Sequence, residues 1–154
     1  MTKHEYICAI ADVVRSKSDC FKRKVGAVFV NADYEILATG YNAPPRGFQH
    51  CDRTDERNNF VNCMPHTCGE PCTRTIHAEQ NAVAQAAKRG TALAHSTLYC
   101  TYAPCQTCAR LLINIGVVKV VVLEKDKDVT GHEELAMGGI PVFYAQDHGS
   151  ELSL

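Results

Sequence analysis

Two short motifs in the sequence carry side chains that bind metal ions and transfer protons. His77 and Glu79 stand two residues apart in the segment TIHAEQNA (75–82), and Cys105 and Cys108 form a Cys-x-x-Cys pair. One imidazole and two thiolates are typical zinc ligands, and a set of three leaves the fourth tetrahedral position to water, as in catalytic zinc sites. Side chains two apart on a helix do not face each other, so we expect Glu79 to transfer protons beside the metal and not to bind it.

Each motif precedes a pattern typical of a helix, and this shared context favours one joint site. A Cys-x-x-Cys pair alone is also typical of redox proteins, and a lone His-x-Glu is typical of a helix start with an acid near the positive end of the dipole. At a helix start, thiolates are stabilised by the dipole. Together the four side chains favour a hydrolytic zinc site, in which the ion lowers the pKa of a coordinated water toward about 7.

The charge balance restricts the partners that we expect. The 154 residues contain 16 Lys plus Arg against 17 Asp plus Glu, and this near-neutral balance argues against a protein that binds nucleic acid through its phosphates. A basic cluster before the first strand is interpreted as a solvated helix end and turn, although a local basic patch stays open as an alternative. The cluster consists of Arg15, Lys17, Lys22, Arg23 and Lys24.

We expect a cytoplasmic protein with reduced cysteines and no membrane partner. The apolar run 117–123 is far too short to span a bilayer. Asp12 and Arg15 interrupt the only stretch that resembles a signal-peptide core. Nine cysteines without an export signal indicate metal binding or catalysis more than disulfide bonds.

Hydrophobic periodicity divides the chain into alternating helices and strands. We expect helices at 5–16, 77–89, 105–115 and 132–137, and strands at 25–30, 35–41, 97–101, 117–123 and 140–145. This order predicts an α/β protein with a mixed five-stranded sheet between helices, in three α-β-α layers. We predict a single domain, 1–154, with a Cys/His-rich insertion at about 42–75 that needs an anchor and a loose tail at 147–154.

Four segments make the chain resemble the cytidine/deoxycytidylate deaminase superfamily over nearly its whole length. They are 24–28 (KVGAV), 39–47 (TGYNAPPRG), 77–82 (HAEQNA) and 102–105 (YAPC). The H-x-E…P-C-x-x-C pattern is the zinc deaminase signature, and the G-Y-N loop narrows the resemblance to the deoxycytidylate (dCMP) deaminases. Relatives commonly read G-Y-N-G-x-P, and Ala43 stands in place of the glycine here.

The resemblance implies a three-layer cytidine deaminase-like fold and the hydrolytic deamination of dCMP to dUMP and ammonia. It also implies a catalytic zinc ion on His77, Cys105 and Cys108. Glu79 would protonate N3 of the pyrimidine and then the leaving amine, as general acid/base chemistry requires.

Substrate contacts are implied in the same way. Asn42 would bind the sugar, the Ala78 backbone would meet the pyrimidine, and Tyr102 would flank the base, although a half-buried tyrosine at a strand end explains Tyr102 equally well. A phosphate needs a cationic or N–H-rich partner, for which Arg46 and Arg74 are candidates, with a solvated arginine as the alternative for each. Structural roles are implied for Gly26, Ala27 and Pro104.

A second, structural zinc ion would anchor the insertion. Some deoxycytidylate deaminases carry such an ion, with cysteines that match Cys20 and Cys51 among its ligands. Cys72 and either His66 or Cys68 would complete the tetrahedron. Of the remaining three cysteines, Cys8 and Cys100 are expected to be core residues, and Cys63 lies in the insertion.

The resemblance further implies a homohexamer that is activated by dCTP, with Mg²⁺ assisting this effector, and inhibited by dTTP. Other enzymatic interpretations are a deaminase of a triphosphate, ribo- or modified cytosine nucleotide, of a free nucleoside, or of tRNA adenosine; the near-neutral charge counts against tRNA. The non-enzymatic alternative is a structural zinc module that binds a partner. Glu79 discriminates between these classes, because a purely structural site needs no carboxylate there.

Overall fold

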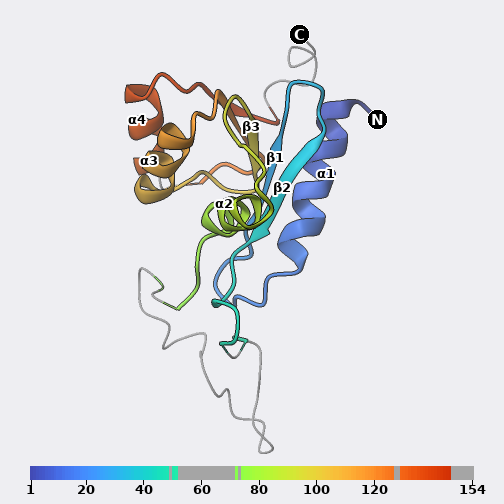
Figure 1. Cartoon of the computed structure of the whole chain (residues 1–154), viewed down its shortest axis with the longest axis vertical. Helices are drawn as coiled ribbons and strands as arrows, with labels where there is room; N and C mark the ends of the chain where they lie inside the picture. Colours follow the sequence, from blue (N-terminus) through green and yellow to red (C-terminus); the bar gives the residue numbers. More distant parts are fainter. Residues whose placement is uncertain (49, 52–71, 73, 127–128, 147–154) are drawn as a thin grey trace, which may run out of the picture.

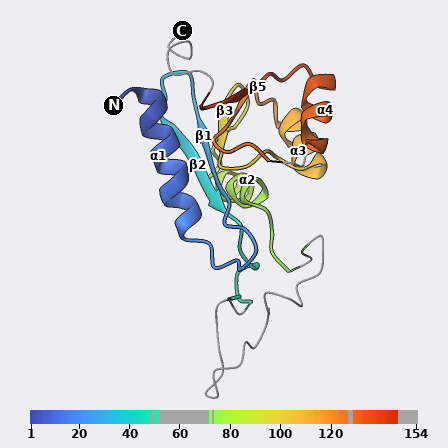
Figure 2. The same cartoon turned by 180° about the vertical axis from the view of Figure 1, so that it is seen from behind.

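The computed structural model describes residues 1–48, 50–51, 72, 74–126 and 129–146. Within these residues, helices and strands follow one another in the predicted order (Figures 1 and 2). The helices are α1 (Lys3–Ser16), α2 (Ala78–Arg89), α3 (Gln106–Ile115) and α4 (Thr130–Met137). The strands are β1 (Gly26–Val30), β2 (Ile36–Tyr41), β3 (Thr97–Cys100), β4 (Lys119–Val122) and β5 (Val142–Tyr144).

The strands form one five-stranded sheet in the order β2-β1-β3-β4-β5. β1 pairs antiparallel with both β2 and β3, whereas β3 pairs parallel with β4, and β4 parallel with β5. The parallel connections pass through α3 and α4, as parallel pairs require a long crossover. The predicted mixed sheet is confirmed.

Both faces of the sheet are covered, because alternate side chains of its central strands point to opposite faces. On one face Val28, Tyr99 and Val121 pack with Ile7 and Ala11 of α1. The larger core lies on the other face, where strand residues meet α2, α3 and α4, and the figures show these helices opposite α1. These strand residues are Ala27, Phe29, Leu98, Cys100, Val120 and Val122. The predicted three layers are confirmed.

Local hydrogen bonds set the ends of the helices. Thr2 and Glu5 form a capping box, in which the Thr2 hydroxyl accepts from the Glu5 N–H and the Glu5 carboxylate accepts from the Thr2 N–H. This explains why α1 begins earlier than the apolar pattern predicts. Gly90 and Gly116 end α2 and α3 in the left-handed conformation, with φ of 68° and 80°.

The two ends of the predicted insertion are joined directly. Ala43 and Ile76 exchange two backbone hydrogen bonds, with N···O distances of 3.3 and 3.0 Å. This bridge fixes the backbone just before α2. Residues 52–71, which include most of the insertion, and the predicted tail at 147–154 lie outside the described residues.

Two glycines allow helices to lie directly on strands. A Cβ on Gly40 would come 2.3 Å from the Ala78 carbonyl oxygen and 2.4 Å from the Ala82 nitrogen, so the first turns of α2 touch the backbone of β2. A Cβ on Gly26 would come 2.4 Å from the Ala11 carbonyl oxygen of α1. These contacts give the physical reason for the structural role expected of Gly26.

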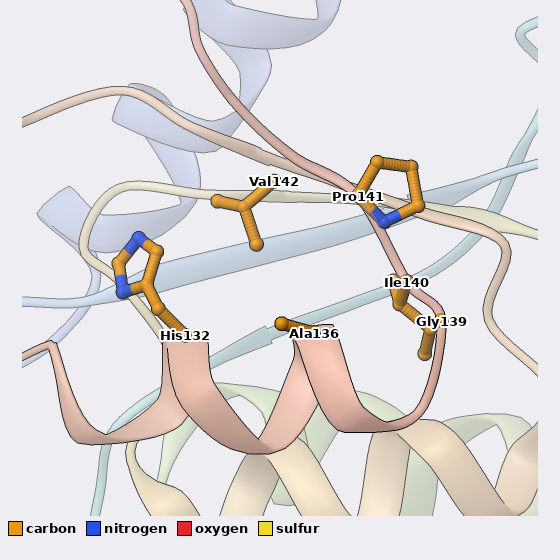
Figure 3. A pocket seen from close by; sticks show the side chains of 6 residues that line it. All are labelled: His132, Ala136, Gly139, Ile140, Pro141 and Val142. Carbon is orange, nitrogen blue, oxygen red and sulfur yellow. The ribbon is translucent and has the colours of Figure 1, made fainter.

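A cavity of about 450 Å³ lies between α4 and the segment that enters β5 (Figure 3). Among the described residues that line it, His132 is the one ionisable residue, and its Nε2 atom lies 2.9 Å from the Tyr144 hydroxyl. The other lining residues are Ala136, Gly139, Ile140, Pro141 and Val142. This apolar lining offers no set of catalytic groups.

The described helices include none with the length and apolarity needed to cross a membrane.

Replacing Gly40 with alanine should disturb both stability and the start of α2. The new methyl group overlaps the α2 backbone, and such overpacking costs about 1–3 kcal/mol. We expect a lower free energy of unfolding in urea and reduced zinc content, since α2 begins beside His77. Gly90→Ala is the control: it adds strain at a positive φ but meets no atom within 4 Å, and it should keep its zinc. Equal zinc content in both variants would contradict the prediction.

Candidate catalytic metal site

The sheet topology brings the starts of α2 and α3 together. β2 and β3 both run antiparallel to β1, which lies between them, so β2 and β3 point in the same direction. The segments that follow them therefore leave the sheet at the same edge, which is where ligand sites form in open α/β sheets. His77 caps the N-terminus of α2 and Cys105 that of α3.

The backbone around His77 is held from several sides. The Ala43–Ile76 bridge immediately precedes it, and its own N–H donates to the Gln80 side-chain oxygen at 3.0 Å. One turn into α2, the Asn81 amide donates to the Tyr41 carbonyl at the end of β2. The imidazole is thus presented by a rigid element, which a metal site needs.

The Cys-x-x-Cys turn is held by α4. Pro104 is buried, and a Cβ on Gly131 of α4 would come 1.8 Å from the Pro104 carbonyl oxygen. Only a residue without a side chain allows this approach. The Ala109 N–H donates to the Cys105 carbonyl at 2.8 Å and starts α3, with Cys108 buried one turn later. This packing accounts for the structural role expected of Pro104.

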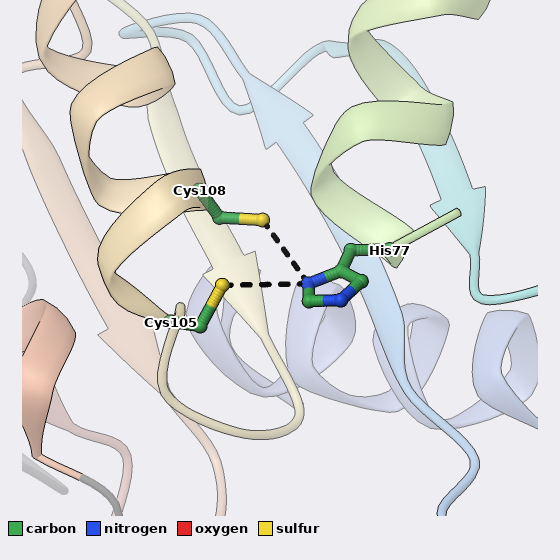
Figure 4. A group of neighbouring side chains, drawn as sticks. All are labelled: His77, Cys105 and Cys108. Atoms are coloured by element: carbon green, nitrogen blue, oxygen red, sulfur yellow. Dashed lines mark hydrogen bonds between the residues drawn. The ribbon is translucent and has the colours of Figure 1, made fainter. Parts of the chain in front are cut away.

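The three predicted ligands converge on one point (Figure 4). The Sγ atoms of Cys105 and Cys108 each lie 3.4 Å from His77 Nδ1, and all three ligand atoms lie within 4.8 Å of one another. Around a tetrahedral zinc ion, sulfur and nitrogen ligands stand about 3.5 Å apart. The donor set and its spacing therefore fit zinc, with three ligands from the described part of the chain.

Hydrogen bonds among the three ligand side chains favour the thiolate form of Cys105. Hydrogen bonds from Cys108 and from His77 lower the pKa of Cys105 to about 4. The bond with Cys105 raises the pKa of His77, and donation to Cys105, together with burial, raises the pKa of Cys108. A thiolate at a helix N-terminus is ready to bind a cation.

Glu79 is buried beside these ligands and does not face bulk solvent. It is 3% exposed, and burial raises the pKa of its carboxyl group. The positive charge of His77 and the interaction with the Cys108 side chain act in the opposite direction and lower this pKa. A raised pKa lies closer to neutral pH, where a carboxyl group can both take and give a proton.

The ligands and Glu79 line a cavity of about 580 Å³. Its walls come from the segment before β1, the end of β2, the start of α2 and the turn after β3. The described lining residues are Cys20, Lys22, Arg23, Val25, Asn42, Cys72, Thr75, His77, Ala78, Glu79, Tyr102, Ala103, Cys105 and Asp126. This size suits a small organic ligand.

Residues 1–124 match the family model described as the cytidine and deoxycytidylate deaminase zinc-binding region. The chain belongs to the cytidine and deoxycytidylate deaminase family. The deoxycytidylate deaminase of Enterobacteria phage T2 is 30% identical over 174 residues, which cover 92% of this chain and 91% of the phage protein.

Two further deaminases of this family are similar. The deoxycytidylate deaminase of Saccharomyces cerevisiae is 36% identical over 124 residues, which cover 75% of this chain but only 36% of the yeast protein. The chain thus spans about a third of that relative. The crystal structure of the dCMP deaminase from cyanophage S-TIM5, in complex with dCMP and dUMP, superposes with a TM-score of 0.73. It has 30% sequence identity, and the match covers 91% of this chain and 94% of that one.

The residues that the family resemblance predicted for substrate binding lie in two places. Asn42, Ala78 and Tyr102 line the cavity, whereas the exposed Arg46 and the half-buried Arg74 are not among its lining residues. The Asn42 amide accepts from the Val25 N–H and donates to the Arg23 carbonyl, each at 2.8 Å. Ala27 is fully buried in the core.

The cavity also contains three charged residues that the motifs did not single out: Lys22, Arg23 and Asp126. Arg23 is ion-paired with Asp126, and its Cζ atom lies 4.6 Å from the centre of the Tyr102 ring. In the sequence, the basic cluster before the first strand was the signal that could have pointed to Lys22 and Arg23. Only the folded chain shows that two of its members face the site.

The structure describes three of the residues predicted to bind a second zinc ion, Cys20, Cys51 and Cys72. Cys20 and Cys72 line the same cavity, and the buried Cys51 donates its N–H to the Asp19 carboxylate, which also contacts His50. Among the described side chains, only the His77 group brings three ligand atoms within 4.8 Å. The further predicted ligands His66 and Cys68 lie outside the described residues.

Cys108→Ala should remove one metal ligand and lower the zinc content by about one ion per chain, because two remaining ligands hold zinc poorly. Elemental analysis of the purified protein measures this. Cys100→Ala is the matched control, since Cys100 is equally buried but lies outside the ligand group. Full zinc occupancy in Cys108→Ala would refute the assignment.

Proposed function

We propose that the chain is a zinc-dependent enzyme that hydrolyses dCMP to dUMP and ammonia. The observation that carries this proposal is the buried Glu79 carboxyl beside a three-ligand metal group at the wall of a cavity. The similarity to named deoxycytidylate deaminases, one of them crystallised with dCMP and dUMP, supports the choice of substrate.

His77, Cys105 and Cys108 would hold the ion, which supplies a Lewis acid that makes water nucleophilic near neutral pH. Glu79 performs the proton transfers. It takes one proton from the attacking water and gives it to N3 of the pyrimidine. It then takes the second proton from the hydroxyl group now on C4 and gives it to the amino group as the C4–N bond breaks. One water is consumed and one ammonia leaves, so the carboxyl group ends in its starting state.

The remaining cavity residues orient the nucleotide. The Ala78 backbone lies at the start of α2 beside the metal ligands, where it can meet the pyrimidine. Asn42 is held by two hydrogen bonds and is 8% exposed, so its amide offers a fixed contact for the sugar. Tyr102 lines the same cavity and would flank the base.

The alternatives differ in substrate more than in chemistry. A triphosphate, a ribonucleotide or a modified cytosine nucleotide would use the same metal group and Glu79, and a nucleoside or a tRNA adenosine would use them without a specific phosphate contact. A structural zinc module remains the non-enzymatic alternative. Against it stands the burial of Glu79, because an unused buried carboxyl group costs stability.

Several finer predictions belong to the same proposal. A second zinc ion is predicted on Cys20, Cys51 and Cys72 with His66 or Cys68. We also predict a homohexamer in the cytoplasm, with dCTP and Mg²⁺ as activators and dTTP as inhibitor. Cys20, from the segment before β1, and Cys72, from the insertion, both line the substrate cavity, so an ion held by them would fix one wall of that cavity.

Measuring ammonia release from a panel of candidate substrates tests both the substrate and the catalytic role of Glu79. A panel of cytosine nucleosides, monophosphates and triphosphates should give the highest kcat/KM with dCMP. Glu79→Gln should keep its zinc but lose about 10²–10⁴-fold in kcat, since general acid/base catalysis contributes that much.

Glu133→Gln serves as the control, because Glu133 is exposed on α4 and does not line the cavity, so this variant should keep full activity. Unchanged turnover in Glu79→Gln would reject the mechanism. No ammonia from any member of the panel would favour the structural module.

Cys51→Ser tests the second metal. If Cys51 is a ligand, the zinc content should fall from two ions to one per chain, while the ion on His77 remains. Cys8→Ser is the control, since Cys8 lies on α1. A Cys51→Ser protein with two zinc ions would end this part of the proposal.

A further inference from the structure

One wall of the substrate cavity is a segment that belongs to no helix or strand. It connects α1 to β1, and it contributes Cys20, Lys22, Arg23 and Val25 to the cavity lining. The backbone groups of such a segment have no helix or strand partners, so they need hydrogen bonds from elsewhere. Asn42, which directly follows β2, supplies several of them.

Asn42 is bonded to this wall through its backbone and its side chain. Its backbone N–H donates to the Val25 carbonyl at 3.2 Å, and its side-chain oxygen accepts from the Val25 N–H at 2.8 Å. Its side-chain nitrogen donates to the Arg23 carbonyl at 2.8 Å. The flipped amide would set N–H against N–H and oxygen against oxygen, so these bonds fix its orientation.

Ser18 holds Asn42 from the other side. Its hydroxyl donates to the Asn42 carbonyl at 2.7 Å and accepts from the Cys20 N–H at 3.3 Å. The Ser18 N–H donates to the Arg15 carbonyl in the last turn of α1, at 3.0 Å. Ser18 is only 1% exposed, so bulk water does not compete for its hydroxyl. One buried side chain thus joins the end of α1, the cavity wall and Asn42.

The bond from Ser18 also reaches the backbone that carries the metal ligand. The Asn42 carbonyl and the Ala43 N–H belong to one peptide group. The carbonyl accepts from Ser18, and the N–H donates to the Ile76 carbonyl at 3.3 Å. Bonds at both ends of a peptide group polarise it and strengthen each other. Because Ile76 directly precedes His77, Asn42 has a fixed place relative to the metal group.

Asn42 can still donate to a ligand. An amide group carries two N–H bonds, and the contact with Arg23 uses one of them. Asn42 lines the cavity, so its second N–H can reach a bound nucleotide. The deoxyribose of dCMP has one free hydroxyl group, and the oxygen of this group can accept such a bond. The direction of the amide therefore decides whether this contact forms.

We infer that Ser18 is a positioning residue for the substrate, which acts by fixing Asn42 and the direction of its second amide N–H. Ser18 does not line the cavity and so does not touch the reacting atoms. It also lies outside the four segments that carry the family resemblance. The inference rests on the proposed deamination of dCMP and on the sugar contact proposed for Asn42.

The test removes the Ser18 hydroxyl and compares two substrates that differ only in the sugar. They are dCMP and 2′,3′-dideoxycytidine 5′-monophosphate, which lacks the sugar hydroxyl. In zinc-loaded Ser18→Ala, the KM for dCMP should rise about 3- to 10-fold, the size of one hydrogen bond, with kcat within about twofold. The KM for the dideoxy compound should stay within about twofold of the wild-type value, because Asn42 has no sugar hydroxyl to bind there.

Ser96→Ala is the matched control. Ser96 is also fully buried, and its hydroxyl also donates to a backbone carbonyl, that of Leu93, at 2.6 Å. It precedes β3 and does not line the cavity. Its loss should lower the free energy of unfolding in urea and leave the KM for dCMP unchanged.

A second variant keeps the test decisive if Ser18→Ala does not fold. Ser18→Cys fills nearly the same space, but a thiol is a weak donor. It should raise the KM for dCMP, and not that for the dideoxy compound, with a smaller loss of stability.

The outcomes distinguish the inference from the proposed function. If the wild-type protein releases no ammonia from dCMP, the proposed function fails, and the inference fails with it. If dCMP is deaminated but both Ser18 variants keep the wild-type KM, only the inference is overturned. An equal rise for the two substrates, or the same rise in Ser96→Ala, would also overturn it, because the hydroxyl would then support the fold alone.

Discussion

The contact between the first turns of α2 and α3 is the constraint on which the rest of the site depends. A zinc ion reaches only about 2.3 Å to sulfur and about 2.0 Å to nitrogen, so ligands from two helices must be placed to within a few tenths of an ångström. The fold achieves this by flanking β1 with two strands that run in the same direction, each followed by a segment that leaves the sheet at one edge. Because Gly40 and Gly131 have no side chain, α2 can pack directly on the backbone of β2, and α4 can pack directly on the turn at Pro104.

This rigid framework explains how a carboxyl group can be buried at the same place. Removing Glu79 from water disfavours its charged form, and a core position without compensation would be unfavourable. Here the helix start and the neighbouring thiols partly solvate the group while the cavity gives it access to a ligand. Perturbed carboxyl groups of this kind gather at functional sites, because proton transfer near neutral pH needs them.

The cavity has a different character at its two walls. One wall holds the imidazole, the thiols and the buried acid, which suit chemistry on a polar ring. The other holds Lys22, Arg23 and Asp126, ordered by an aromatic platform. A ligand that is flat and uncharged at one end and anionic at the other matches both, and a nucleoside monophosphate has this form. Lys22 and Arg23 precede His77 by more than fifty residues in sequence, and Asn42 is bonded to the backbone of this segment before β1.

The sequence by itself determined the order of the elements and the residue types of the metal group. Apolar periodicity and helix-ending glycines are local signals, so α2, α3 and the strands of the sheet could be placed within a few residues. The spacing of His77, Cys105 and Cys108 likewise indicated a metal site, and the matching family model describes a zinc-binding region. Helix starts were less certain, because the Thr2–Glu5 capping box extends α1 beyond its apolar pattern.

Only the tertiary structure decided which charged residues line the cavity. In a run of basic residues, the sequence does not distinguish a residue that faces solvent from one that lines a site. Hydrophobic periodicity does not show which side of a turn will meet a cavity. Arg23 lies against Asp126, about a hundred residues later in the chain, and against Tyr102, and all three line the cavity. Arg46 was a candidate for phosphate binding on sequence grounds, but it is exposed and does not line the cavity. Contacts between distant segments depend on how the strands pair, and that information is spread over the whole chain and absent from any single motif.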